Sequence, residues 1–203
     1  VSFNVRQGEI VGIAALEGQG QGDLFRTLVG LSKAQGGRVE VAGAPARIGN
    51  PGTALRVGNG VAFLPEDRKS EGILAGLSTA TNMALPIISR IARGGVVWPA
   101  SERRAARETA AAVDLQERYL HFKIDELSGG NQQKALLARV IMTGARTLLL
   151  FDPTRGVDVG TKQSIYEAIR KFAADGGSVL FYSSELPELV HLAADHAVQR
   201  VLA

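Results

Sequence analysis

Two glycine-rich stretches in this chain each precede a predicted helix, and both have a composition suited to binding phosphate. In the first, an apolar run at Glu9–Ala14 is followed by Gly18, Gly20 and Gly22, and a helical pattern begins at Leu24. A strand, a glycine-rich turn and a helix in this order direct backbone N–H groups toward a phosphate. The sequence therefore predicts a phosphate-binding loop near its beginning.

The second stretch reads Leu-Ser-Gly-Gly-Asn-Gln-Gln-Lys over Leu127–Lys134. Ser128 can cap the helix that follows, while Gly129 and Gly130 leave the helix end open to an approaching anion. The positive end of the helix and its free N–H groups suit a γ-phosphate. Taken alone, Ser-Gly-Gly is also compatible with an incidental glycine-rich helix start.

The composition sets limits on the class of protein. The chain has 203 residues, of which 45% are hydrophobic and 21% charged, as in an ordinary globular domain with one sizeable core. No apolar run approaches the roughly 20 residues of a membrane-spanning helix, so any work at a membrane is that of a peripheral subunit.

The charge pattern argues against a nucleic-acid-binding protein, and the cysteine and histidine content argues against disulfides, thiol chemistry and a histidine metal site. The net charge is only +3 and both signs are interspersed. The densest cluster, Glu102–Arg104 with Arg107, is better explained as a solvated helix face than as a nucleic-acid surface. There is no cysteine, and the three histidines lack the spacing of metal ligands.

Strands alternate with helices over much of the chain, which predicts a parallel sheet covered on both faces. The predicted strands are Glu9–Ala14, Gly60–Leu64, Thr147–Phe151, Ser178–Tyr182 and an incomplete one at Ala197–Ala203, with a hairpin formed by Gly37–Val41 and Ala46–Ile48. The predicted helices of this part are Leu24–Val29, Thr161–Ala173 and Glu185–Ala193.

The middle of the chain, about Leu77 to Thr143, has a mostly helical pattern. We therefore expect an α/β core formed by residues 1–76 and 144–203, with an inserted helical subdomain at 77–143 that carries the second glycine-rich stretch. Met83 and Trp98 stand among apolar neighbours and are expected to pack inside that subdomain.

Four segments together resemble the ABC transporter ATPases. Leu127–Lys134 resembles their LSGGQ signature, in the LSGGNQQK form typical of bacterial monosaccharide importers of the ribose, galactose and xylose type. Leu148–Lys162 resembles the Walker B strand and D-loop, Phe63–Lys69 the Q-loop region, and Tyr182–Leu189 the switch region. The segments follow the family's order and span the chain. The resemblance implies an α/β P-loop NTPase (RecA-like) core with an ABC helical subdomain.

The first phosphate-binding loop departs from the family's pattern. A P-loop, G-x-x-x-x-G-K-[ST], needs its lysine against the phosphates and its hydroxyl on Mg²⁺. Gln21 stands at the lysine position and Gly22 at the hydroxyl position, while Glu17 and Asp23 flank the loop with negative charge. Tight binding of Mg-ATP is not expected here, and residual nucleotide binding stays open. The nucleotide-binding positions implied by the resemblance are Gly18, Gln19, Gly20, Gln21, Gly22 and Glu66.

The remaining catalytic positions depart in the same direction. Phe151 stands where the Walker B aspartate orients Mg²⁺, Asp152 stands at the catalytic glutamate position, and Ser184 replaces the switch histidine. No protein ligand for a metal is therefore expected in this loop. An alignment shifted by one residue would make Asp152 the metal ligand but would put Pro153 at the glutamate position, so the site is disabled in either case.

The resemblance also implies partners. ABC domains pair head to tail, so that each ATP lies between the P-loop of one domain and the signature of the other. Ser128, Gly129, Gly130 and Gln132 are expected to complete a site for ATP and Mg²⁺ on a partner domain, with Asp158 of the D-loop shaping the interface.

In sugar importers that partner is the N-terminal nucleotide-binding domain of the same polypeptide, which would make this chain the second, C-terminal domain. The chain begins in a strand-like segment without Met and stops within another, which favours a piece of a longer protein. Membrane permease subunits are expected near residues 66–68, and a periplasmic or lipid-anchored sugar-binding protein would act indirectly. The implied location is the cytoplasmic face of the bacterial inner membrane.

Two other functions remain open from the sequence. The domain could be a non-hydrolysing module that serves dimerisation and permease docking, in which case its signature would not touch ATP. It could also be a soluble ABC protein acting on ribosomes or DNA, although the mixed charge and the importer-type signature argue against a nucleic-acid partner. The transported sugar is not encoded in this chain.

Overall fold

The computed structural model describes residues 1–16, 18–193 and 198–200. These residues form two compact units, one comprising Val1–Phe63, Ala145–Asp152 and Ile169–Ala203, the other Leu64–Gly144 and Pro153–Ala168. The second unit is larger than the helical subdomain 77–143 expected from the sequence, because side chains from 64–76 and 153–168 contact the start of its longest buried helix.

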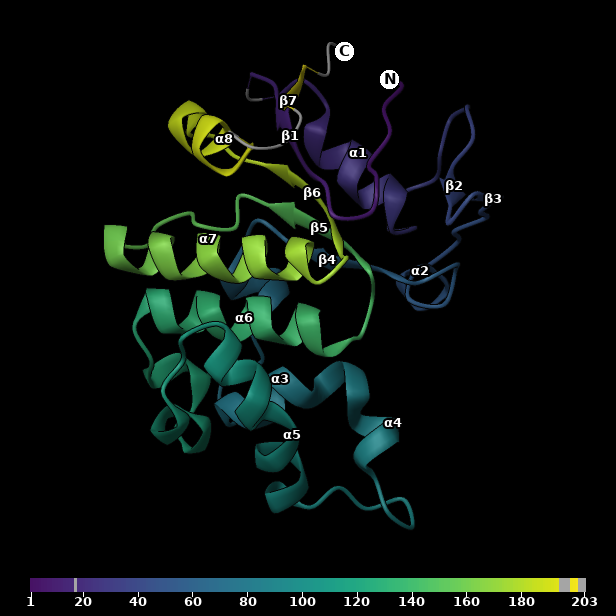
Figure 1. Ribbon diagram of the computed structural model, residues 1–203. Helices are drawn as coiled ribbons and strands as arrows, with labels where there is room; N and C mark the ends of the chain where they lie inside the picture. The colour runs from purple at the N-terminus through teal and green to yellow at the C-terminus, as the bar shows by residue number, and fades with distance from the viewer. Residues whose placement is uncertain (17, 194–197, 201–203) are drawn as a thin grey trace. The chain divides into compact units, whose positions relative to one another are not determined.

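The first unit is built on a five-stranded sheet with the order β4-β5-β6-β1-β7 (Figure 1). Strands β5 and β6, β6 and β1, and β1 and β7 pair in parallel. This arrangement confirms the predicted α/β class. Of the strand predicted at 197–203, residues 198–200 form β7, and the other residues lie outside the described part. The strands are β1 (Ile10–Ala14), β4 (Val61–Leu64), β5 (Thr147–Phe151), β6 (Ser178–Tyr182) and β7 (Val198–Arg200).

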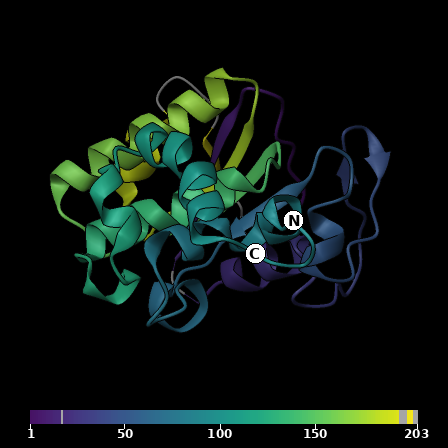
Figure 2. The same ribbon diagram turned by 90° about the horizontal axis from the view of Figure 1, so that it is seen from below.

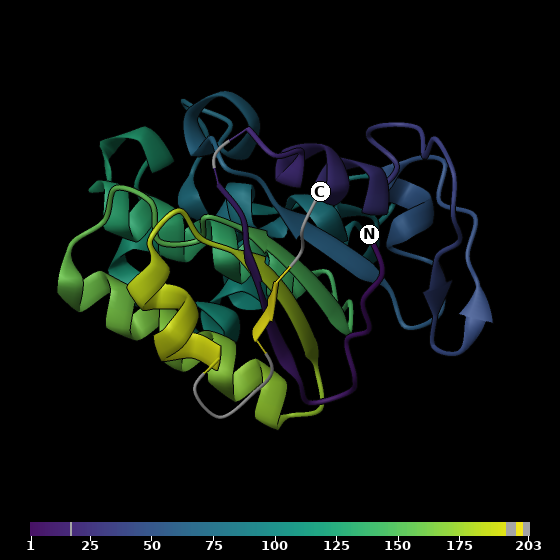
Figure 3. The same ribbon diagram turned by 90° about the horizontal axis from the view of Figure 1, so that it is seen from above.

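Helices α1 (Gln21–Leu28) and α8 (Leu186–Ala193) cover opposite faces of this sheet (Figure 3). Successive strand residues point to opposite faces. On one face Val11 packs in the same core cluster as Phe25 of α1. On the other, a Cβ added to Gly12 would meet Leu189 of α8 at 3.1 Å. Burial of both faces explains why the strands are continuous apolar runs.

The second unit is mainly helical, and α3 and α5 pack against α6 (Figure 2). Met83 is fully buried as predicted, whereas Trp98 is 59% exposed, so its predicted role in packing is wrong. Trp98 directly precedes Pro99, at the start of α5, where the chain leaves the unit's core. The elements are η1 (Arg68–Gly72), α3 (Thr79–Ala84), η2 (Leu85–Ile87), α4 (Ile88–Ile91), α5 (Pro99–Ala112), η3 (Glu117–His121), η4 (Ile124–Glu126), α6 (Gly129–Met142) and α7 (Val159–Ala174), which continues into the first unit.

A small antiparallel hairpin and a short helix complete the first unit. The hairpin pairs β2 (Glu40–Val41) with β3 (Ala44–Pro45), and α2 spans Pro51–Ala54. The second hairpin strand therefore precedes the predicted Ala46–Ile48, because Ala42 and Gly43 both have positive φ and close a two-residue turn. None of the described helices has the length and apolar character needed to cross a bilayer.

Candidate nucleotide-binding site

The sequence-predicted site residues fall into one group in each unit. The first unit contains Gly18, Gln19, Gly20, Gln21, Gly22, Asp152 and Ser184. The second unit contains Glu66, Ser128, Gly129, Gly130, Gln132 and Asp158.

The glycine-rich loop of the first unit has the backbone conformation expected of a phosphate-binding nest. Gly18 and Gly20 both have φ of 84°, a region open mainly to glycine. Gly20 is the N-cap of α1 and offers no side-chain bond to the helix. The backbone N–H of Leu16 donates to Oε1 of Gln19 at 2.9 Å, which fixes the entry to the loop. Glu17, predicted to repel a phosphate, lies outside the described residues.

Gln21, at the lysine position, is buried within the protein. Its Nε2 donates to the hydroxyl of Tyr182 at 3.3 Å, and its Oε1 is buried without a hydrogen-bond partner. The side chain therefore supplies no positive charge to the loop, and its one described side-chain hydrogen bond is to the core.

An aromatic cluster occupies the place where the family's metal-binding residues would meet. The Phe151 ring lies 5.3 Å from the Phe25 ring in an edge-on contact and 4.7 Å from the Tyr182 ring. A Cβ added to Gly22 would lie 3.9 Å from Cε2 of Phe151. The position lacking a hydroxyl thus borders on a hydrocarbon ring, and the described residues contain no cluster of three or more acidic or histidine side chains.

Asp152 and Ser184 bond to each other. The backbone N–H of Ser184 donates to Oδ1 of Asp152 at 3.0 Å, and the Ser184 hydroxyl lies 2.9 Å from Oδ2. Asp152 is 4% exposed and has φ of 50°, an unusual value for a non-glycine residue. Its carboxylate thus joins the segments that follow β5 and β6.

The signature segment forms a regular helix start in the second unit. Ser128 is the N-cap of α6, and its Oγ accepts from the backbone N–H of Asn131 at 3.4 Å. Gly130 is fixed by packing, because an added Cβ would lie 2.5 Å from Oγ1 of Thr161 at the beginning of α7. The helix end at Gly129 is formed as the sequence predicted.

Gln132 follows on the same helix. Its side chain is buried, and Nε2 donates to the carbonyl oxygens of Ile124 at 3.2 Å and Leu127 at 3.1 Å. These bonds hold the loop before α6, and the contact of Gln132 with a partner domain's phosphate stays a prediction. Gln133 likewise donates from Nε2 to the carbonyl oxygen of Pro153 at 2.7 Å.

Asp158 acts as the cap of α7. Its Oδ1 accepts from the backbone N–H of Thr161 at 2.9 Å and its Oδ2 accepts from the Thr161 hydroxyl at 2.8 Å. These bonds, the backbone one first, lower the pKa of Asp158 below its ordinary value of 3.8. The D-loop position predicted at the interface thus sets where α7 begins.

The Q-loop region is tied to the segment that follows β5. Glu66 forms an ion pair with Arg155, and Nη1 of Arg68 donates to the carbonyl oxygen of Arg155 at 2.9 Å. Asp67 caps the π-helical turn η1, and its pKa is lowered mainly by the hydroxyl of Ser70 and then by the backbone N–H of Lys69. Glu66, expected near nucleotide, is therefore engaged with a guanidinium within its own unit.

Sequence reasoning missed an ion pair made by the signature helix, in which the lysine is buried and the aspartate is exposed. Nζ of Lys134 lies 2.7 Å from Oδ2 of Asp114, and the Lys134 side chain is only 8% exposed. The Ser164 hydroxyl of α7 donates to the same oxygen at 2.9 Å. The bond from Lys134, followed by that from Ser164, lowers the pKa of Asp114. The presence of Lys134 among the apolar residues of α6 was the sequence feature that could have indicated a charged partner.

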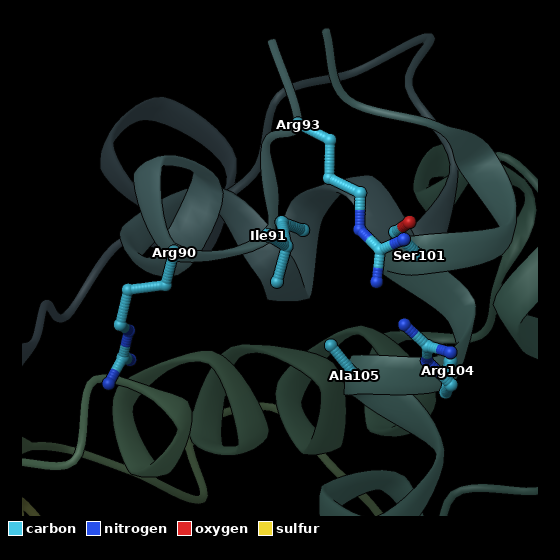
Figure 4. A pocket seen from close by; sticks show the side chains of 6 residues that line it. All are labelled: Arg90, Ile91, Arg93, Ser101, Arg104 and Ala105. Atoms are coloured by element: carbon cyan, nitrogen blue, oxygen red, sulfur yellow. The ribbon is translucent and has the colours of Figure 1, made fainter. Parts of the chain in front are cut away.

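A cationic pocket lies elsewhere in the helical unit (Figure 4). It has a volume of about 190 Å³, and none of the predicted site residues lines it. Arg93 and Arg104 point toward each other across it, whereas Arg90 extends away and donates to the carbonyl oxygen of Met142 at 2.7 Å. This pocket takes no part in the arrangement described above.

The two groups of residues fit nucleotide differently. The loop at Gly18–Gly22 keeps the backbone nest, but Gln21 and Gly22 supply neither a cation nor a hydroxyl. Asp152 is bonded to Ser184, the exposed Asp23 lies in the first turn of α1, and the described residues contain no group of three or more acidic or histidine side chains that could hold a metal ion. The start of α6 offers the N-terminal N–H groups of a helix, with glycine at Gly129 and the Arg68 guanidinium beside it.

Comparison with known proteins gives consistent matches. Residues 1–155 match the family model described as ABC transporter. The chain is 40% identical over 94% of its length to a ribose import ATP-binding protein, RbsA 1, of Mesorhizobium japonicum, and 42% identical over 95% of its length to RbsA of Chromobacterium violaceum. It spans only 37% and 38% of those two relatives' lengths.

Solved structures share the fold at lower sequence identity. The dimeric structure of a bacterial ABC transporter cassette matches with a TM-score of 0.75 at 23% identity, covering 94% of this chain and 80% of that one. A nucleotide-free ATP-binding cassette from an ABC transporter matches with a TM-score of 0.78 at 19% identity, covering 98% and 80%. The fold is thus that of a P-loop ABC cassette.

Proposed function

Because the chain belongs to the ABC transporter family, we propose that it is the second, C-terminal nucleotide-binding domain of a sugar importer of the ribose type. Relatives named as ribose import ATP-binding proteins support the substrate class. In this proposal the domain's own P-loop site does not hydrolyse ATP, and its signature helix completes the ATP site of a partner domain. One contrast carries the proposal: Gln21 and Phe151 occupy the lysine and metal-ligand positions of the loop, whereas the helix start at Ser128 is formed as in the family's signature.

Electrostatics supports the inactivity of the domain's own site. A lysine charge about 4 Å from a phosphate charge contributes about 4 kcal/mol at the effective dielectric of a protein surface. A helix N-terminus contributes only about 0.3–1 kcal/mol per charge. With Gln21 bonded to Tyr182 and Phe151 filling the metal position, the loop retains only the smaller contribution.

In this proposal the signature helix contributes backbone N–H groups to the ATP site of the partner domain. Ser128 caps a helix whose first residue is Gly129, so backbone N–H groups are available there, and the fold match to a dimeric cassette supports pairing of two such domains. ATP supplies the phosphate that bridges the two domains, and loss of that bridge on hydrolysis would let them separate. Ser128 and the backbone of Gly129 would hold and orient that phosphate.

The proposed partners follow from this arrangement. They are the N-terminal nucleotide-binding domain of the same polypeptide, membrane permease subunits and, indirectly, a periplasmic or lipid-anchored sugar-binding protein. The domain would work at the cytoplasmic face of the bacterial inner membrane. ATP and Mg²⁺ would be held chiefly at the composite site.

Two measurements test this function. An ATPase assay on this chain alone with Mg²⁺ should give no turnover above a Gly20→Ala variant, and turnover typical of active ABC domains would refute the inactive site. In the transporter that contains this chain, Ser128→Arg should abolish ATPase activity although Ser128 lies outside the P-loop of its own domain.

The alternative function, a module for dimerisation and permease docking alone, makes the opposite prediction for the second measurement. If the signature never touches ATP, Ser128→Arg leaves ATP turnover unchanged. A matched variant at an exposed serine of the same unit, Ser89→Arg, introduces the same charged side chain away from the signature and controls for its general effect on the complex.

A further inference from the structure

Arg68 makes contacts at two loops that meet at the start of the signature helix. Its Nη1 donates to the carbonyl oxygen of Arg155 at 2.9 Å. Its Nη2 lies 2.8 Å from where a Cβ on Gly129 would stand, and Nη1 lies 3.7 Å from the corresponding point on Gly156. The guanidinium thus lies between the first residue of α6 and the turn that leads to the D-loop.

This placement also accounts for a property of Gly129. Gly129 does not have a positive φ, so its backbone conformation does not require a glycine. A methyl group at this position would press on the Arg68 guanidinium, so the glycine leaves room for the arginine as well as for an approaching phosphate.

The charge of Arg68 is attracted by the neighbouring Asp67 carboxylate, whose pKa it helps to lower, and is opposed by the start of α6. A cation beside the N-terminus of a helix faces the positive end of the helix dipole. Within the part of the chain that the structure describes, Glu66 pairs with Arg155 and no carboxylate forms an ion pair with Arg68. Its Nε is buried and lacks a hydrogen-bond partner. An anion bound at the helix end would relieve this repulsion.

We propose that Arg68 is a positioning residue that fixes the start of the signature helix against residues 155–156 and makes this helix end ready for the phosphate of the partner domain's ATP. The inference rests on the function proposed above and deepens it. Arg68 lies at the first residue of η1, in the Q-loop region, so a displacement of that region would shift the signature helix start through the guanidinium.

The test uses the transporter that contains this chain, assembled with its permease, and measures ATPase activity against ATP concentration. Arg68→Ala should raise KM for ATP about tenfold and change kcat less than twofold. Arg68→Lys keeps the charge but has one donor group in place of the planar fork, so its KM should rise about threefold. Lys69→Ala, which removes an exposed charge from the neighbouring residue, should stay within twofold of the wild type in both constants.

The outcomes separate this inference from the proposed function. If Arg68→Ala and Arg68→Lys both behave like Lys69→Ala while Ser128→Arg abolishes turnover, the positioning role is refuted and the trans role of the signature stands. If Ser128→Arg leaves turnover unchanged, the proposed function itself fails. Thermal unfolding of each variant shows whether it is folded. Should Arg68→Ala fail to fold, the KM for ATP of Arg68→Lys decides: a raised KM supports the positioning role of Arg68, and a wild-type KM overturns it.

Discussion

Replacing Phe151 tests whether the metal position of this family has become part of the hydrophobic core. The substitution Phe151→Ala removes a ring that is 6% exposed and contacts the rings of Phe25 and Tyr182. Phe25 is itself fully buried, so the space left behind cannot be filled by solvent-facing side chains. The same substitution at a metal-orienting position of an open active site would leave the fold's stability nearly unchanged.

The structure sets the expected magnitude. Truncation of a buried phenylalanine to alanine costs about 3–5 kcal/mol of unfolding free energy. Each of the two aromatic contacts contributes about 0.5–1.5 kcal/mol of that sum. Phe151→Leu keeps most of the apolar volume, and such volume-conserving substitutions cost less than about 1.5 kcal/mol. We therefore expect alanine to be destabilising by at least about 1.5 kcal/mol more than leucine at this position.

Urea unfolding of this chain, followed by circular dichroism, measures both values. The midpoint should fall strongly for Phe151→Ala and slightly for Phe151→Leu, with an unchanged slope. A loss below about 1 kcal/mol for the alanine variant would show that the ring contributes little to the core. The interpretation of position 151 as part of the hydrophobic core would then be wrong.

Two further predictions concern the second unit. Gly130→Ala places a methyl group 2.5 Å from Oγ1 of Thr161 and should destabilise the chain by about 1–3 kcal/mol, with part regained in the double variant with Thr161→Ala; an additive loss in urea midpoints would contradict the clash. Folding lowers the pKa of Asp158 from 3.8, so its carboxylate stabilises the fold above that pH, and this contribution is lost as the pH falls through the lowered value. The stability of the wild type relative to Asp158→Asn should therefore fall between pH 6 and pH 2, and parallel curves would refute this.

The sheet could be predicted from the sequence where apolar runs are bounded by polar residues or glycine. Thr147–Phe151 and Ser178–Tyr182 form strands with the predicted bounds, because both faces of each strand are buried. The hairpin was misplaced because its register depends on the positive φ of Ala42 and Gly43. Of the apolar stretch at 46–48, the backbone N–H of Ala46 donates to the carbonyl oxygen of Val39 at 2.8 Å, although the assigned strand ends at Pro45. Trp98 was misjudged because apolar neighbours in sequence do not indicate which side of a helix start faces the core.

The backbone of the candidate site could be predicted better than its side-chain contacts. The glycines at 18–22 and Ser128 before Gly129 indicated the loop and the helix start that the structure has. That Gln132 bonds two carbonyl groups, and that Lys134 is paired with Asp114, depends on three-dimensional neighbours that no local pattern specifies.

The substitutions in the first unit are linked by contact, and this argues against reversal by a single mutation. Tyr182 accepts the bond from Gln21 and packs against Phe151, while the next strand end holds Ser184 against Asp152. Restoring lysine at position 21 alone would leave Phe151 where the metal should bind, and restoring aspartate at 151 alone would bury a charge among aromatic rings at a cost of several kcal/mol. If the loop is inactive as proposed, activity in this unit would therefore require changes at both positions, because neither substitution alone supplies the cation and the carboxylate together.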